Sequence, residues 1–350
     1  MNNKALRCDI FCAVVDNFGD AAVCWRLACQ LATEHGWQIR LWIDDLTPLR
    51  QLAPDFAAGP VAVHPWPTPW LGDDPADVVI EAFACEPPPA YVATMASSAR
   101  APVWLNLEYL SAESWVAGSH GLPSPHPRLP LLKHFYFPGF AAGTGGLLRE
   151  RDYDARRASF DETAFRAESA LPPRLPGELT VSLFSYPNPA LPGLIDAWSR
   201  WAAPERPVRV LLPGSSDPAR SIGSLSLLPL PFLPQHRYDE LLWTCDLNFV
   251  RGEDSFVRAQ WAAKPFVWHI YPQAEDAHLA KLDAFLAIHP AGAALRPFWL
   301  AWNGAGRLDW PAFAAALPGL ETPSRHWAEI LASHPDLASG LVKFCLERLK

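Results

Sequence analysis

The sequence predicts an α/β protein of two domains, each built from buried strands that alternate with helices. Its 350 residues favour two domains over one, because a domain usually has about 100–200 residues. Hydrophobic residues make up 50% of the chain and charged residues 19%, so the chain folds around a large core. Short apolar runs followed by helical stretches recur in both halves. Such strands pair in parallel, and we expect helices on both faces of each sheet.

The first domain is expected to span residues 1–150 and begins with a strand, a loop and a helix. Residues 8–15 are a continuous apolar run, DNFGD (16–20) follows, and apolar residues then recur at helical spacing up to Gly36. Further elements of this domain are strands at 38–43, 61–64, 78–82, 103–107 and 134–137 and a helix at 90–96.

The composition changes at residues 151–178, where charged residues, a short helix and a proline cluster predict a linker region. A second strand–helix series follows and predicts the second domain at residues 179–323. It comprises strands at 179–185, 208–212 and 247–250 and helices at 191–201, 238–245 and 256–263. Residues 324–350 are strongly helical and are a candidate for packing back on the first domain.

Charge and hydropathy exclude several classes of partner. The net charge of −8, from 37 acidic and 29 basic residues, argues against nucleic-acid binding. No apolar run reaches the ~18 residues of a membrane span, and Asp16 interrupts the N-terminal one, so we expect a soluble cytoplasmic protein without a secretory signal. The seven cysteines are odd in number and never spaced C-x-x-C, which predicts reduced core thiols and no metal site.

The loop DNFGD places two carboxylates at the end of the first strand. Asp20 stands where a helix N-cap is expected, and capping alone would be worth ~1 kcal/mol. Asp16 has no such obvious capping role, and two acids on one loop could hold a cationic substrate or accept a proton. Gly19 stands alone where a dinucleotide-binding G-x-G-x-x-G would be expected, so an NAD-dependent oxidoreductase is disfavoured.

The turn RGEDS (251–255) follows the strand at 247–250 and opens a helix. A helix N-terminus exposes free N–H groups and a partial positive charge, which suits a diphosphate, and Ser255 could add a donor. Glu253 and Asp254 would repel a phosphate but could face a sugar or an acceptor. As acids in a first helical turn they also fit a purely structural role.

Aromatic and amide side chains follow other strands of the second half. A planar base needs a ring to stack on and an amide to pair with its edge. The residues of these types are Phe184, Tyr186, Phe232 and Gln235.

Several motifs, in this order along nearly the whole chain, resemble the bacterial protein-arginine rhamnosyltransferase family EarP. They are DNFGD with VCWRL (23–27), NLEYLSAESWV (106–116), LPSPHP (122–127), LFSYPN (183–188), FLPQ (232–235) and RGEDSFVRAQ (251–260). The resemblance implies the GT-B glycosyltransferase arrangement, with two Rossmann-like domains facing across a cleft. It also implies inverting transfer of L-rhamnose from dTDP-β-L-rhamnose to an arginine of translation elongation factor P. No cluster of metal ligands is evident in the sequence, so we expect no metal and no cofactor.

The resemblance assigns roles to the loop residues. Asp20 would be the general base and Asp16 a second essential acid, with Glu253 contacting the sugar or supporting catalysis. The implied nucleotide-sugar-binding residues are Asn17, Phe18, Gly19, Phe184, Tyr186, Phe232, Gln235, Arg251, Gly252, Glu253, Asp254 and Ser255.

The chemistry is consistent with these roles. Guanidinium keeps its proton up to a pKa above ~12 and is a poor nucleophile, so a carboxylate must orient one nitrogen and accept its proton. A helix N-terminus can stabilise the departing diphosphate without a metal. Two alternatives remain open: a GT-B glycosyltransferase with another nucleotide sugar or acceptor, and a non-catalytic protein-binding module on the same fold.

Overall fold

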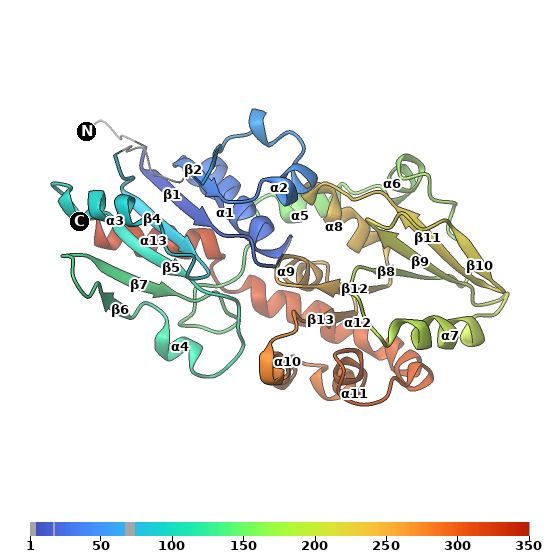
Figure 1. The fold of residues 1–350 in the computed structure, drawn as a ribbon. Coiled ribbons are helices and arrows are strands. Elements are labelled where there is room, and N and C mark those ends of the chain that lie inside the picture. The colour runs from blue at the N-terminus through green and yellow to red at the C-terminus, as the bar shows by residue number, and fades with distance from the viewer. Residues whose placement is uncertain (1–4, 17, 67–73, 350) are drawn as a thin grey trace. The chain divides into compact units, whose positions relative to one another are not determined.

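A computed structural model of the chain describes residues 5–16, 18–66 and 74–349. The chain divides into two compact units (Figure 1). Unit 1 comprises Met1–Arg151 with Leu331–Lys350, and unit 2 comprises Asp152–Ile330. A linker region was expected at residues 151–178. Arg151 ends the first segment of unit 1, and residues 152–178 are part of unit 2, where the Arg157 guanidinium donates to the Trp261 carbonyl at 2.9 Å.

The described part of unit 1 contains a seven-stranded sheet in the order β3-β2-β1-β4-β5-β7-β6. All its pairings are parallel except that of β6 with β7 at the edge. Its elements are β1 (Arg7–Cys12), α1 (Gly19–His35), β2 (Gln38–Ile43), α2 (Thr47–Leu52), η1 (Phe56–Ala58), β3 (Ala62–Pro65), β4 (Val78–Ala82), α3 (Pro89–Ser97), β5 (Val103–Leu107), α4 (Val116–Ser119), β6 (Pro123–Pro125), β7 (Leu132–Tyr136) and α13 (Leu337–Arg348). Strands β4 and β5 are buried along their whole length, as expected for parallel strands covered on both faces.

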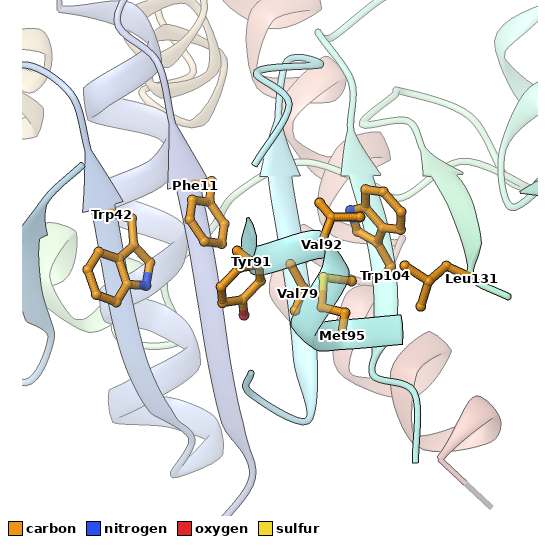
Figure 2. Close-up of a cluster of buried hydrophobic side chains, with 8 residues drawn as sticks. All are labelled: Phe11, Trp42, Val79, Tyr91, Val92, Met95, Trp104 and Leu131. Carbon is orange, nitrogen blue, oxygen red and sulfur yellow. The ribbon is translucent and has the colours of Figure 1, made fainter. Parts of the chain in front are cut away.

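One face of this sheet carries a cluster of large apolar side chains (Figure 2). The cluster consists of Phe11, Trp42, Val79, Tyr91, Val92, Met95, Trp104 and Leu131. Phe11 pairs in register with Trp42 and Val79 with Trp104, so these four strand residues project from neighbouring strands, and α3 supplies Tyr91, Val92 and Met95. This packing holds β1, β2, β4 and β5 in place relative to one another.

The C-terminal helix α13 belongs to unit 1 and packs on α1. The Gln30 side chain donates to Asp336 Oδ1 at 3.0 Å, and the Leu337 amide donates to the Leu147 carbonyl at 2.9 Å. Gly146 has φ 77°, and a Cβ there would lie 2.3 Å from the Pro335 carbonyl oxygen. Only glycine allows this close approach of the returning chain.

Unit 2 contains a six-stranded sheet in the order β10-β11-β9-β8-β12-β13, parallel except for β10. Its elements are α5 (Tyr153–Ala158), α6 (Glu162–Glu168), β8 (Leu179–Leu183), α7 (Leu191–Trp201), β9 (Val208–Pro213), β10 (Arg220–Ile222), β11 (Leu225–Leu230), α8 (Gln235–Thr244), β12 (Leu247–Arg251), α9 (Asp254–Trp261), β13 (Phe266–His269), η2 (Ala274–Asp276), α10 (Ala277–Ile288), α11 (Gly292–Trp302) and α12 (Trp310–Ala332), whose last two residues are assigned to unit 1. Strands β10, β11 and β13 were not expected from the sequence.

Both sheets reverse their strand order at one point. In unit 1 the chain moves outward from β1 through β2 to β3 and then returns to β4 on the other side; in unit 2 it moves from β8 through β9 to β11 and returns to β12. Ligands of such sheets bind at this reversal, at the carboxyl ends of the strands. The loop 16–20 follows β1 and the turn 251–255 follows β12, so the sheet topology places each of them beside a reversal.

Candidate functional site

The Asp20 carboxylate is fixed by the loop that precedes its helix. Helix α1 begins at Gly19, its N-cap residue is Phe18, and Asp20 lies in the first turn, 1% exposed. Asp20 Oδ2 accepts hydrogen bonds from the backbone amides of Val15 and Asp16, both at 2.8 Å. The interpretation of Asp20 as an N-cap is therefore wrong, because its side chain bonds to amides before the helix and not to those of the first turn.

Asp16 and Gly19 are in close contact. The Gly19 amide donates to the Asp16 carbonyl at 2.5 Å, and a Cβ at Gly19 would lie 2.5 Å from Asp16 Oδ2. A side chain at position 19 would therefore have to displace the Asp16 carboxylate. The Asp16 carboxylate thus lies at the start of α1, where the helix dipole favours a negative charge. Asn17, also expected to bind the donor, lies outside the described residues.

Two aromatic residues beside Asp20 were not expected from the sequence. The Tyr109 hydroxyl donates to Asp20 Oδ1 at 3.3 Å, and the Tyr109 ring stacks on that of Phe83 with centroids 4.2 Å apart. Tyr109 follows β5 and Phe83 follows β4, so the same sheet edge supplies both. Tyr109 lies in the NLEYL motif directly after a predicted strand, and that position could have identified it.

The turn of unit 2 is closed by its own serine. Gly252 has φ 62°, a backbone conformation that favours glycine. Ser255 Oγ accepts from the Arg251 amide at 3.0 Å and donates to the Arg251 carbonyl. In this structure the Ser255 hydroxyl therefore bonds within the turn, and its role as an added phosphate donor stays a prediction. Glu253 is the N-cap residue of α9, whose first turn follows it.

Asp254 is part of a buried polar network. Its Oδ2 accepts from Gln235 Nε2 and from Arg258 Nε, both at 3.0 Å. Arg258 also binds Asp239 at 2.9 Å, and Asp239 accepts from Arg156 at 3.2 Å. The resemblance implies that Asp254 binds the nucleotide sugar, and in this structure its Oδ2 bonds to side chains within unit 2. The hydrogen bond from Gln235 Nε2 to Asp254 Oδ2 orients the Gln235 amide.

Arg251 lies against two of the other expected donor-binding residues, Phe184 and Tyr186. Its guanidinium carbon lies 4.3 Å from the ring centroid of Phe184 and 4.9 Å from that of Tyr186. Its Nη1 donates to the Ser185 carbonyl at 3.2 Å, and the ring of Phe232 lies 6.5 Å from that of Phe184. In this structure Arg251 thus lies against the two rings expected to hold the base.

Three further side chains near this group were not expected from the sequence. Tyr238 lies 5.9 Å from Phe184 between ring centroids, and Tyr186 makes edge contacts with His269 at 5.3 Å and Tyr271 at 5.5 Å. Burial, with Arg251 and His278 nearby, lowers the pKa of His269 to about 4, so its ring is neutral at pH 7. His269 ends β13, a strand that was not expected.

The two groups of residues have different chemistry. The group in unit 1 is a buried carboxylate held by amides and a phenol, which can bind a cation and accept a proton. The group in unit 2 combines aromatic rings, an amide, an arginine and a helix N-terminus, a set that suits a nucleotide with phosphates.

The described residues contain neither a cluster of metal ligands nor a membrane-spanning helix. Within residues 5–16, 18–66 and 74–349, no three His, Cys, Asp or Glu side chains lie close enough together to hold a metal ion. In the same part of the chain, no helix combines the length and the apolar character needed to cross a bilayer. All seven cysteines are free thiols, and five of them are buried, which fits the core thiols predicted from the sequence.

Solved structures identify the fold. A structure described as the basis for EarP-mediated arginine glycosylation of translation elongation factor EF-P is 34% identical, with a TM-score of 0.66, and the match covers 98% of this chain and 99% of that one. The calicheamicin glycosyltransferase CalG4 is 16% identical, with a TM-score of 0.55 and 99% coverage of both chains. SnogD from Streptomyces nogalater is 13% identical, with a TM-score of 0.54, over 99% of this chain and 100% of that one. The chain has the GT-B glycosyltransferase fold, as the resemblance implied.

Sequence relatives identify the family. A protein-arginine rhamnosyltransferase of Pseudomonas putida is 46% identical over 96% of this chain and 97% of the relative. One from Pseudomonas aeruginosa is 45% identical over 96% of this chain and 98% of the relative. The profile of the family described as "Elongation-Factor P (EF-P) rhamnosyltransferase EarP" matches residues 8–346. This chain therefore belongs to the EarP family of protein-arginine rhamnosyltransferases.

Proposed function

We propose that this protein transfers L-rhamnose from dTDP-β-L-rhamnose to an arginine side chain of translation elongation factor P, with inversion at the anomeric carbon. The observation that carries the proposal is the Asp20 carboxylate in a chain of this family. It is buried and accepts two loop amides beside the reversal of strand order in unit 1. An acceptor that works in translation puts the reaction in the cytoplasm.

The acceptor half of the reaction is assigned to Asp20 and Asp16. One guanidinium nitrogen attacks the anomeric carbon, the carbon–oxygen bond to the diphosphate breaks, and the departing group is dTDP. The nitrogen loses a proton as the new bond forms, and Asp20 accepts it. Asp16 adds a second negative charge that holds the cation in line for attack. A single displacement of this kind inverts the anomeric carbon.

The donor half is assigned to unit 2. The N-terminus of α9 and the Arg251 guanidinium would bind the diphosphate and stabilise it as it leaves. Gln235, oriented by Asp254, would pair with the edge of the thymine, and Phe232 would stack on its face. Glu253, the N-cap residue of the same helix, would contact the transferred sugar. Phosphate stabilisation by the protein would make the transfer independent of metal ions.

Intact-mass analysis of elongation factor P after incubation with this protein and dTDP-rhamnose tests the proposal. We expect one added deoxyhexose, absent when the acceptor arginine is replaced by lysine and retained in EDTA. The anomeric configuration of the product, read by NMR, should be opposite to that of the donor.

Two other outcomes of this experiment would support the alternative functions. A mass increase only with another nucleotide sugar would indicate a different donor specificity. Tight binding of elongation factor P with no mass increase would indicate a non-catalytic binding module.

A further inference from the structure

The Asp20 carboxylate has a partner outside its own loop. Its Oδ2 is occupied by the Val15 and Asp16 amides, and the Tyr109 hydroxyl donates to Oδ1 at 3.3 Å. The Tyr109 ring stacks on Phe83 at 4.2 Å with an interplanar angle of 13°. Both oxygens of the carboxylate are thus restrained, one by the backbone and the other by a phenol that is itself held in a stack.

The segment that carries Phe83 has an unusual backbone. Phe83, Ala84 and Glu86 have φ of 57°, 56° and 49°, in the left-handed region that costs a residue with a side chain about 1 kcal/mol or more. Two hydrogen bonds from the segment to β5 hold it in place. The Phe83 amide donates to the Leu107 carbonyl at 2.7 Å, and the Ala84 amide donates to Asn106 Oδ1 at 3.0 Å.

The three residues with positive φ are not themselves part of the core. Phe83 is only half-buried, and Ala84 and Glu86 are exposed. Asn106, by contrast, is 1% exposed, and its side-chain amide also donates to Glu108 at 2.5 Å. A buried side chain therefore accepts the hydrogen bond that anchors the exposed Ala84. What the strained turn does achieve is to set the face of Phe83 against Tyr109. Strain of this kind, enforced by the surroundings, clusters at functional sites.

We propose that Tyr109 is a positioning residue that orients the Asp20 carboxylate toward the acceptor guanidinium, with Phe83 and the strained turn fixing the phenol. The inference rests on the proposed function. A hydrogen bond to Oδ1 limits rotation of the carboxylate, so that its remaining acceptor capacity points in one direction. A planar guanidinium needs such a fixed partner, because only one of its nitrogens can be in line with the anomeric carbon.

Tyr109→Phe tests this role, because it removes the hydroxyl and keeps the ring that stacks on Phe83. With elongation factor P and dTDP-rhamnose as substrates, we expect kcat to fall about 10- to 100-fold, the effect of losing a hydrogen bond to a charged group. The KM for elongation factor P and the Kd for dTDP should change by less than about threefold, and the melting temperature should be retained.

Tyr91→Phe is the matched control. The Tyr91 hydroxyl donates to Asp9 Oδ2 at 2.5 Å in the core of the same unit. Figure 2 shows Tyr91 in the cluster of buried apolar side chains there. We expect this variant to lose stability and keep the wild-type kcat. A second variant, Phe83→Leu, removes the stack and leaves the hydroxyl; it should lower kcat less than Tyr109→Phe does, and Phe83→Tyr should restore the rate.

The outcomes separate the two proposals. If the wild type modifies elongation factor P and Tyr109→Phe does so with an unchanged kcat, the positioning role is overturned and the proposed function stands. The role is also overturned if the loss of kcat in Tyr109→Phe is matched in Tyr91→Phe. If the wild type adds no sugar to elongation factor P, the proposed function fails and the positioning role fails with it.

Discussion

At the scale of single residues, the structure shows that the Asp20 carboxylate binds loop amides and does not cap its helix. Sequence reasoning could identify an acid in a loop at the end of the first strand, because residue types and strand ends are visible in the sequence. It could not determine which amides the carboxylate binds, because that depends on where α1 begins. The helix begins at Gly19, one residue before Asp20, and the carboxylate therefore turns back to the Val15 and Asp16 amides.

Asp20→Asn should separate structure from catalysis. The amide oxygen of asparagine can accept both loop hydrogen bonds, so we expect the fold and dTDP binding to be retained. An amide cannot accept the guanidinium proton, and the loss of a general base typically lowers the rate about 10²- to 10⁴-fold. The measurement is the rate of deoxyhexose addition to elongation factor P, with melting temperature and dTDP affinity measured on the same sample.

Asp336→Asn is the control for this substitution. Asp336 is the N-cap of α13, where its side chain accepts from the Ser339 amide at 3.0 Å. Asparagine caps nearly as well as aspartate, so this variant should keep both stability and transfer rate. Transfer at the wild-type rate in Asp20→Asn would remove Asp20 as the general base and direct the search to Asp16 or Glu253.

Gln235→Ala should weaken discrimination between bases. The thymine and cytosine edges differ in their donors and acceptors, and an amide can read that difference. We expect the preference for dTDP over dCDP, measured by calorimetry, to fall in this variant. Asp254→Asn should lower it as well, because Asp254 orients the Gln235 amide. A preference equal to that of the wild type in Gln235→Ala would exclude this amide as the reader of the base.

At the scale of elements, the Ser255 hydroxyl holds the turn between β12 and α9 together. Its hydroxyl bonds to both the amide and the carbonyl of Arg251. Ser255→Ala should therefore lower the free energy of unfolding by about 1–2 kcal/mol and weaken dTDP binding at the same time, because the turn loosens. Denaturant unfolding of the unliganded protein and calorimetric titration measure the two effects. Weaker binding with unchanged stability would instead assign the hydroxyl to the ligand.

The long apolar strands could be predicted from the sequence, and the irregular ones could not. Strands β2, β4 and β5 begin and end where the sequence predicts them. Strand β11 was missed because Pro229 argues against a strand. Strand β10 pairs with β11 only at residues 225–227. Pro229 lies beyond this pairing, where the β10 side of β11 has no neighbouring strand. The missing N–H of the proline therefore breaks no hydrogen bond on that side. Strand β13 is a four-residue run, too short to be distinguished by periodicity.

At the scale of the whole molecule, the loops of the candidate site could be predicted, but their contacts could not. Both units use a doubly wound sheet, and the loops after β1 and β12 flank the two reversals of strand order. Strand ends can be read from the sequence. Contacts such as Tyr109 with Asp20 join segments 89 residues apart, and only the folded strand order brings those segments together.

The stability of unit 2 should depend on pH through two buried histidines. Burial lowers the pKa of His269 and of His289 to about 4 from an ordinary value of 6.5. In the unfolded chain both rings gain a proton as the pH falls through about 6.5, whereas the folded state resists protonation until about pH 4. The unfolded state then binds more protons, so stability is present in full above pH 6.5 and is lost between about pH 6.5 and 4, by up to about 3 kcal/mol per histidine.

A substitution at His289 isolates this effect. His289 Nδ1 accepts from the Ala291 amide at 3.2 Å, and an asparagine oxygen can accept the same bond without gaining a charge. Chemical denaturation at pH 7 and pH 5 should show that His289→Asn loses less unfolding free energy between the two pH values than the wild type does. The control is His326→Asn, at a ring that is 62% exposed, which should follow the wild type. A buried ring that stays neutral while the unfolded chain is protonated must contribute to the loss of unfolding free energy between pH 7 and pH 5. If the wild type and His289→Asn lose the same amount, burial of His289 does not set the acid sensitivity.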